Sequence, residues 1–185
     1  MTNNRNDNVN TRNLVVDILL AVTRDGAFSH IAIRDVLDKY RYLPKQDRAF
    51  ITRLSQGTIE RMIELDAIIN QFSKTKVKKM KPVIAAILRS GVYQLKYMDS
   101  VPDSAACNEA VKLTVKRGFG GLKGFVNGVM RTIARNMDQI CYPDAEKEPV
   151  RYLSVKYSVP EWLSRLMIDQ YGAQTAETMF ASFLE

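Results

Sequence analysis

The sequence predicts an all-α fold: a helical bundle followed by a second, shorter helical region. Apolar residues recur every three or four positions along almost the whole chain, which is the spacing of one helix face. No segment shows the sustained alternation of apolar and polar residues that a half-buried strand requires. Glycines and prolines stand between the periodic segments, where helices begin or end.

Four helices are expected before the middle of the chain. Asn10 or Thr11 can cap the first helix, and Gly26 ends it. Pro44 stands where the third helix begins, because proline is tolerated in a first helical turn. Gly57 falls inside that helix, where it costs up to about 1 kcal/mol relative to alanine, and this predicts close helix packing or a bend. The four apolar stripes cover residues 14–22, 31–40, 50–62 and 65–72.

Three further helices follow a lysine-rich stretch at residues 74–81. Pro82 opens the first of them, and a glycine cluster at residues 118–121 separates the second from the third. This cluster lacks the Gly-x-x-x-x-Gly-Lys-Ser/Thr order of a phosphate loop, and no strand precedes it. A tight turn between helices is therefore expected. The three helices should cover residues 82–98, 104–116 and 122–133.

Residues 136–149 are polar and contain two prolines, which predicts a connection to a second helical region. That region is broken at residues 158–160 and again at Gly172, which is expected to be the C′ residue of a helix. Its last segment, from Ala176 to Leu184, carries a strong apolar face. The face either folds back on the bundle or packs against a partner that this chain does not contain, and we favour the second.

Composition excludes several classes of protein. No apolar run reaches the roughly 18 to 20 residues that a membrane-spanning helix needs. The Asn-rich residues 1–10 lack the apolar centre of a secretory signal and are expected to form a disordered lead-in. Two cysteines are too few for a disulfide framework. The sequence thus predicts a cytoplasmic protein without a membrane partner.

The residues that usually carry catalysis are scarce. The one histidine, His30, would have to support any Ser/His/Asp or Cys/His nucleophile, and a surface or capping role is favoured for it. No second histidine or cysteine pair is available to complete a metal site. Cys107 is expected to be a buried apolar filler, and nothing near Cys141 marks it as activated. We therefore expect no catalytic, cofactor-binding or metal-binding residues in this chain.

The net charge of +7 is concentrated in one part of the chain. Between Lys74 and Arg135 there are 13 Lys or Arg against 3 Asp or Glu, whereas the remaining residues hold 14 against 17. Such a cluster attracts phosphate, so a nucleic acid is the predicted partner, with a solvated helix face as the alternative. Few aromatic residues stand near these lysines in the sequence, which favours contacts to the backbone and shape of RNA over base stacking. The expected phosphate partners are Arg12, Lys76, Lys78, Lys79, Lys81, Lys116, Arg117, Lys123, Arg131 and Arg135.

A series of short segments points to one family. Residues 26–30 read Gly-Ala-Phe-Ser-His, residues 87–95 read Ile-Leu-Arg-Ser-Gly-Val-Tyr-Gln-Leu, and residues 124–131 read Gly-Phe-Val-Asn-Gly-Val-Met-Arg. Together with Val-Pro-Asp-Ser-Ala-Ala at 101–106, they resemble the NusB-like domain at the N-terminus of the RsmB/Sun/Fmu family of ribosomal RNA cytosine-C5 methyltransferases. Residues 157–163 resemble the segment that leads into the methyltransferase portion, with Val159 in place of the usual histidine.

The resemblance implies a longer protein that uses S-adenosylmethionine and two catalytic cysteines. This sequence shows no strand followed by a glycine-rich loop for the cofactor, and neither of its cysteines stands in a catalytic motif. It implies that the chain is truncated and that its role is to dock small-subunit ribosomal RNA for an absent catalytic domain. A ribosomal protein is a further expected partner. The implied division is a lead-in at 1–10, a NusB-like RNA-binding domain at 11–137, a linker at 138–150 and the start of the methyltransferase region at 151–185.

The alternative is a NusB-type transcription antitermination or adaptor protein that binds RNA and a ribosomal protein. Two features argue against it: the chain continues beyond Asn136, and its first residues lack the arginine-rich run that is common in such proteins. A third hypothesis, a complete small enzyme, is not expected.

Overall fold

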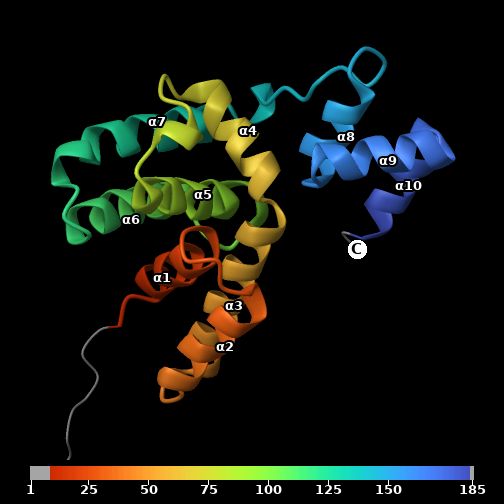
Figure 1. The fold of residues 1–185 in the computed structure, drawn as a ribbon. Coiled ribbons are helices and arrows are strands. Elements are labelled where there is room, and N and C mark those ends of the chain that lie inside the picture. The colour runs from red at the N-terminus through yellow and green to blue at the C-terminus, as the bar shows by residue number, and fades with distance from the viewer. Residues whose placement is uncertain (1–8, 184–185) are drawn as a thin grey trace, which may run out of the picture.

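A computed structural model describes residues 9–183, and all regular structure in this range is helical (Figure 1). The predicted all-α class is therefore confirmed. The expected disordered lead-in at residues 1–10 lies almost wholly outside the described residues, as does Leu184. The α-helices are α1 (Thr11–Thr23), α2 (Ser29–Lys39), α3 (Lys45–Glu60), α4 (Met62–Phe72), α5 (Pro82–Tyr97), α6 (Asp103–Lys116), α7 (Lys123–Arg135), α8 (Pro149–Tyr157), α9 (Glu161–Tyr171) and α10 (Ala173–Ser182). Short 3-10 helices lie at η1 (Val77–Lys79), η2 (Gly120–Leu122) and η3 (Met137–Gln139).

Helix α5 lies at the centre of the main body, with α1, α3, α4, α6 and α7 packed around it (Figure 1). Pro82 occupies its first turn, as the sequence predicts. Its buried residues occur on every side of the helix rather than along one stripe, which is the pattern of a helix enclosed by others. The surrounding helices each contribute one apolar stripe to the same core.

Two glycines allow helices to approach α5 closely. A Cβ atom at Gly57 of α3 would lie 2.1 Å from the Oη and Cζ atoms of Tyr93. A Cβ atom at Gly91 of α5 would lie 2.6 Å from Cε of Met130, on α7. The close packing predicted at Gly57 is thus confirmed, and the second contact seats α7 against α5 with the opposite side of α7 facing outward.

Helices α8, α9 and α10 form a separate group with a small core of their own, beside α4 (Figure 1). Leu153, Ala176 and Phe180 are its buried residues. The sequence predicts that the apolar face of residues 176–184 packs against a partner outside this chain. This prediction is wrong for Ala176 and Phe180, because α8 and α9 cover both of them. Phe183, in contrast, remains 73% exposed.

The segment between α7 and α8 is attached to the main body. Gln71 of α4 donates through Nε2 to the carbonyl of Cys141 at 2.8 Å, and its Oε1 accepts from the amide of Cys141 at 3.0 Å. Ser158, which ends α8 in the left-handed region with φ of 55°, accepts from the backbone N–H of Ile63 through its Oγ at 3.0 Å. The Ser158 bond places the end of α8 against the start of α4, and the Gln71 bonds hold the connecting segment against the end of α4.

No helix of residues 9–183 is both long enough and apolar enough to cross a bilayer.

Alanine substitution should affect Gly57 and Gly128 in opposite directions. Gly57→Ala should lower the free energy of unfolding by about 1–3 kcal/mol, because the added methyl group displaces the largely buried ring of Tyr93. Gly128→Ala, on α7, meets no atom within 4 Å and should raise it by up to about 1 kcal/mol. Urea denaturation of the two variants measures both values, and equal effects would contradict the close packing at Gly57.

Candidate nucleic-acid interface

The outward side of α7 combines glycines with arginines. Gly124, Gly128, Arg131 and Arg135 recur at intervals of four, three and four residues, which places them on one stripe of the helix. All four are exposed, whereas the buried residues of α7 lie on the other side. Apart from the local backbone of α7 and the adjoining residues, no atom lies within 4 Å of the positions that Cβ atoms would take at the two glycines. The helix backbone is therefore open to close approach between the two arginines and the N-terminus of α7.

Two hollows flank α7. A groove of about 510 Å³ runs between α6 and α7 and is lined by Asn108, Val111, Lys112, Lys123, Gly124 and Asn127. A smaller hollow of about 280 Å³ lies between the start of α7 and the η1–α5 segment. It is lined by Thr75, Lys79, Met80, Lys81, Ile84, Leu122 and Phe125.

These hollows and the α7 stripe together form what we call the α7 basic face, which consists of Lys79, Lys81, Lys112, Lys123, Arg131 and Arg135. Lys78 is exposed on η1 beside it. The structure thus places five cations that the sequence predicts as phosphate partners along α7 and in the two hollows that flank it: Lys79, Lys81, Lys123, Arg131 and Arg135.

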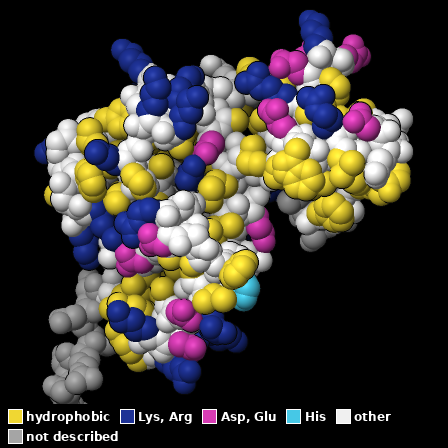
Figure 2. Space-filling model, viewed as in Figure 1, with side chains coloured by type: hydrophobic (Ala, Val, Ile, Leu, Met, Phe, Trp, Pro, Cys, Tyr) yellow, Lys and Arg dark blue, Asp and Glu magenta, His cyan; other side chains and the backbone are white. Residues whose placement is uncertain are grey.

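The charges of the α7 basic face are mostly not neutralised by carboxylates. Among the described residues, only Lys112 of this face forms an ion pair, with Glu109 at 2.8 Å. Arg131 donates to the neutral Oδ1 of Asn127 at 2.9 Å. Figure 2 shows Lys and Arg side chains gathered over the part of the body that carries α7 and the start of α5, where acidic side chains are sparse. A positive potential over this face follows.

Arg117 lies on the other side of the body and is engaged there. It donates to Oδ1 and to the backbone carbonyl of Asn13 at 2.8 and 2.7 Å, and it pairs with Asp17 at 2.7 Å. Its side chain is only 20% exposed. These contacts join the end of α6 to α1, which packs on a different side of α5 from α7 (Figure 1).

Arg12 also lies on the α1 side. It donates to Oε1 of Gln94 at 2.7 Å and stacks over the ring of Phe50, 4.9 Å from its centroid. Burial lowers the pKa of Arg12, partly opposed by the charge of Glu109. Both predicted phosphate partners near α1 therefore hold helices together and are not part of the α7 basic face.

Two more predicted partners lie at the margins. Lys76 lines a different hollow, between α4 and the connecting segment, and its Nζ donates to the carbonyl of Asn70 at 2.9 Å. Lys116 is exposed at the C-terminal end of α6, across the glycine turn from Lys123. Neither lines the two hollows beside α7.

Sequence reasoning missed two residues of this surface. Lys112 follows Glu109 by one helical turn, so the sequence offers an acidic partner for it and no local excess of positive charge. Phe125 stands 44 residues after Lys81 in the chain, yet both line the smaller hollow. The only sequence signal for either is the helical pattern of α6 and α7, which does not say which helices are neighbours.

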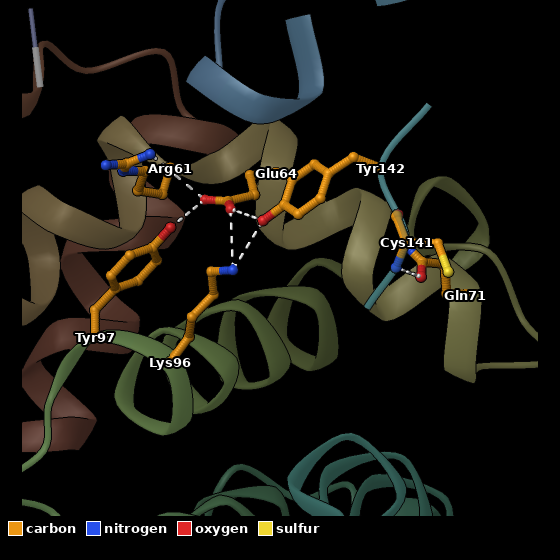
Figure 3. Close-up of polar contacts among 7 residues, drawn as sticks. All are labelled: Arg61, Glu64, Gln71, Lys96, Tyr97, Cys141 and Tyr142. Atoms are coloured by element: carbon orange, nitrogen blue, oxygen red, sulfur yellow. Dashed lines mark hydrogen bonds and ion pairs between the residues drawn. The ribbon is translucent and has the colours of Figure 1, made fainter. Parts of the chain in front are cut away.

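A second polar cluster surrounds the buried Glu64 (Figure 3). This carboxylate is 2% exposed and accepts from the hydroxyls of Tyr97 and Tyr142, each at 2.5 Å. Lys96 and Arg61 lie 3.3 and 3.7 Å from its oxygens. Burial, reinforced by the Glu64 carboxylate, raises the pKa of both tyrosines. Four side chains thus contact the Glu64 carboxylate, which lines none of the hollows described above. The role of the cluster is therefore structural: it attaches Tyr142 of the connecting segment to the body.

The residues considered for catalysis lie apart from one another. His30 is exposed at the start of α2. Cys107 is buried, as predicted, and burial raises the pKa of its thiol. Within residues 9–183, no three His, Cys, Asp or Glu side chains gather where they could hold a metal ion.

Comparison with known proteins gives one family and two kinds of relative. The pattern of the NusB family matches residues 9–135. The chain is 36% identical over 166 residues to a probable ribosomal RNA small subunit methyltransferase B of Bacillus subtilis, and the match covers 90% of this chain and 36% of that protein. It is 39% identical over 90 residues to a transcription antitermination protein NusB of Agathobacter rectalis, covering 48% of this chain and 69% of that protein.

The fold is also found among solved structures. A chain in the crystal structure of the antitermination factors NusB and NusE in complex with double-stranded RNA superposes with a TM-score of 0.62 at 21% identity, covering 68% of this chain and 93% of that one. The present chain spans a little over a third of the length of the methyltransferases that it matches.

Cations that hold helices together and cations of the α7 basic face should differ in their effect on the free energy of unfolding. Arg117→Ala should lower the free energy of unfolding by about 1–3 kcal/mol, because it removes charged hydrogen bonds between α6 and α1. Lys123→Ala should change it by less than about 0.5 kcal/mol, since Lys123 is exposed and makes no such bond in the described chain. Thermal or urea unfolding measures both, and a loss at Lys123 as large as that at Arg117 would contradict this assignment.

Proposed function

Because the chain belongs to the NusB family, we propose that it binds RNA through the α7 basic face, as the RNA-docking portion of an S-adenosylmethionine-dependent ribosomal RNA cytosine-C5 methyltransferase. The observation that carries the proposal is the gathering of cations around α7 without matching carboxylates. Five of the six cations that define this face have no ion-pair partner among the described residues. Such a face gains free energy when a phosphate chain replaces its counterions.

The geometry of α7 favours contacts to the RNA backbone. A sugar–phosphate chain can approach the helix closely over Gly124 and Gly128, where a Cβ atom would meet no side chain within 4 Å. Asn108 and Asn127, in the groove between α6 and α7, supply amide donors beside Lys123. Phosphate contacts of this kind position a protein on RNA, while the shape of the RNA provides much of the selectivity.

The methyltransferase part of the proposal rests on the extent of the similarity. The match to the Bacillus subtilis methyltransferase covers 90% of this chain and therefore includes helices beyond the NusB-family region. We assign residues 11–137 to RNA docking, 138–150 to the connection and 151–185 to the first part of the methyltransferase region. The cofactor and the reacting base would be handled by other parts of such a protein. Docking raises the effective concentration of the target base at that distant site.

The exposed apolar residues of α9 support this division. Trp162 and Leu166, one helical turn apart, are 67% and 44% exposed. Exposed apolar surface of this kind marks contacts with another part of a protein or with a partner.

A second candidate is a NusB-type antitermination or adaptor protein that binds RNA and a ribosomal protein. The similarity to the Agathobacter rectalis NusB protein favours it, because that match covers 69% of the relative. That match covers only 48% of this chain, whereas the methyltransferase match covers 90%. We therefore rank the adaptor second.

Removing lysines from the α7 basic face should reduce the salt dependence of RNA binding. When the chain is titrated with a ribosomal RNA fragment at rising salt, the logarithm of the binding constant should fall steeply with the logarithm of the salt concentration. Lys81→Gln combined with Lys123→Gln should reduce the magnitude of this slope by about 0.7–0.9 for each phosphate that these two lysines neutralise. The double variant Lys39→Gln, Lys45→Gln is the matched control, because both lysines are exposed on the α2–α3 side. A slope near zero for the unmodified chain would rule out RNA binding through phosphates.

The chain alone should transfer no methyl group. Incubation with S-adenosylmethionine and a ribosomal RNA fragment, followed by mass measurement of the RNA, should leave the RNA mass unchanged, because the proposal assigns the reaction to other parts of the protein. Methylated RNA in this assay would instead identify a complete small enzyme.

A further inference from the structure

The smaller hollow beside α7 is lined by different side chains from the groove on the other side of the helix. Its walls are largely apolar: Met80, Ile84, Leu122 and Phe125. The groove between α6 and α7 is lined mainly by asparagine, lysine and glycine. Of the two hollows, only the smaller one is lined by an aromatic ring, and large apolar side chains stand there beside two lysines.

We propose that this hollow binds one unpaired nucleobase of an RNA whose backbone lies on the α7 basic face. The inference rests on the proposed RNA binding and adds a subsite to it. Lys79 and Lys81 line the same hollow, so the two phosphates on either side of an inserted base would meet cations. Charge complementarity thus selects a nucleotide over an uncharged or cationic occupant.

The walls match the faces of a base. Phe125 offers an aromatic ring, and base–aromatic stacking is sequence-tolerant because every base has a π-face. Met80 adds a polarizable thioether, which makes favourable contacts with aromatic rings. Leu122 is 37% exposed beside them, so a base that covers it removes apolar surface from water.

The size and the polar groups also fit one base. About 280 Å³ lies just below the range of roughly 300–1,000 Å³ typical of pockets for drug-sized ligands, so a single planar heterocycle fits better than a larger group. Thr75 lines the hollow, and its hydroxyl makes no hydrogen bond to another described residue. It can therefore donate to or accept from the edge of the base.

Phe125 lies on a helix, and its ring lines the hollow where a base can stack on it. Phe125 packs partly against the main core, and its neighbour Val126 is fully buried. The ring is thus held by the helix and needs little ordering when a base stacks on it. An aromatic residue on a flexible loop would lose more conformational entropy on binding.

The test compares two RNA hairpins of the same length, one fully paired and one with a single unpaired nucleotide in its stem. At fixed salt, the full chain should bind the hairpin with the unpaired nucleotide about tenfold more tightly. Phe125→Leu removes the aromatic ring, and Thr75→Leu fills the hollow from an exposed position. Both variants should lose most of this preference while keeping their affinity for the paired hairpin and the salt slope of binding. Phe50→Leu, a partly buried phenylalanine on the α3 side, is the matched control and should keep the preference.

A second measurement locates the base directly. With 4-thiouridine at the unpaired position, ultraviolet irradiation should crosslink the RNA to residues 79–81 or 122–125, as identified by mass spectrometry. Equal affinity of the unmodified chain for both hairpins, or crosslinks elsewhere, would overturn the base subsite. If a steep salt slope persists in that case, RNA binding through phosphates stands without it. If neither hairpin binds, the subsite and the proposed function fail together.

Discussion

The enclosure of α5 is the constraint on which the rest of the structure depends. A helix buried on all sides needs neighbours that can come close, and glycines at two contacts provide this: Gly57 accommodates Tyr93, and Gly91 accommodates Met130. The second contact fixes the rotation of α7 about its own axis. With Met130 directed into α5, the glycines and arginines of α7 face solvent. The packing of an apolar core thus determines which polar residues form a surface.

Cations of the same chemical type have two kinds of surroundings in this chain, and these decide whether a cation is already paired. Arg117 has Asp17 and the backbone of α1 within hydrogen-bonding distance, so its charge ties two helices together. Arg131 and Arg135 project from a helix face without carboxylates in range among the described residues. A charge that is already paired and partly buried gains little from phosphate, whereas an exposed one retains most of its attraction. The contrast explains why the α7 side, and not the α1 side, is the proposed RNA surface.

Hydrogen bonds at Cys141 and Tyr142 hold the segment between α7 and α8 against the main body. Its residue Tyr142 shares the buried carboxylate of Glu64 with Tyr97, and its residue Cys141 pairs through its backbone with Gln71. A buried carboxylate is stable only when its oxygens are satisfied by such partners, so releasing Tyr142 would leave one of them short of a hydrogen bond. The α8–α10 group is thereby held in a definite place relative to the main body. In the proposed function, one part docks RNA and another acts on it, and a defined geometry between the two parts would make such docking effective.

The sequence by itself determined the helical class, the positions of most helices and turns, the close packing at Gly57 and the family. These properties are local: a spacing of three or four residues, a proline in a first turn or a glycine at a turn acts through neighbouring residues of the same chain. Only the tertiary structure decided which cations share a surface, that α8 and α9 cover Ala176 and Phe180, and that Phe125 lies beside Lys79 and Lys81. Those arrangements depend on how helices cross and which faces meet. Residues far apart in the chain set them, and periodicity within one helix carries no information about its neighbours.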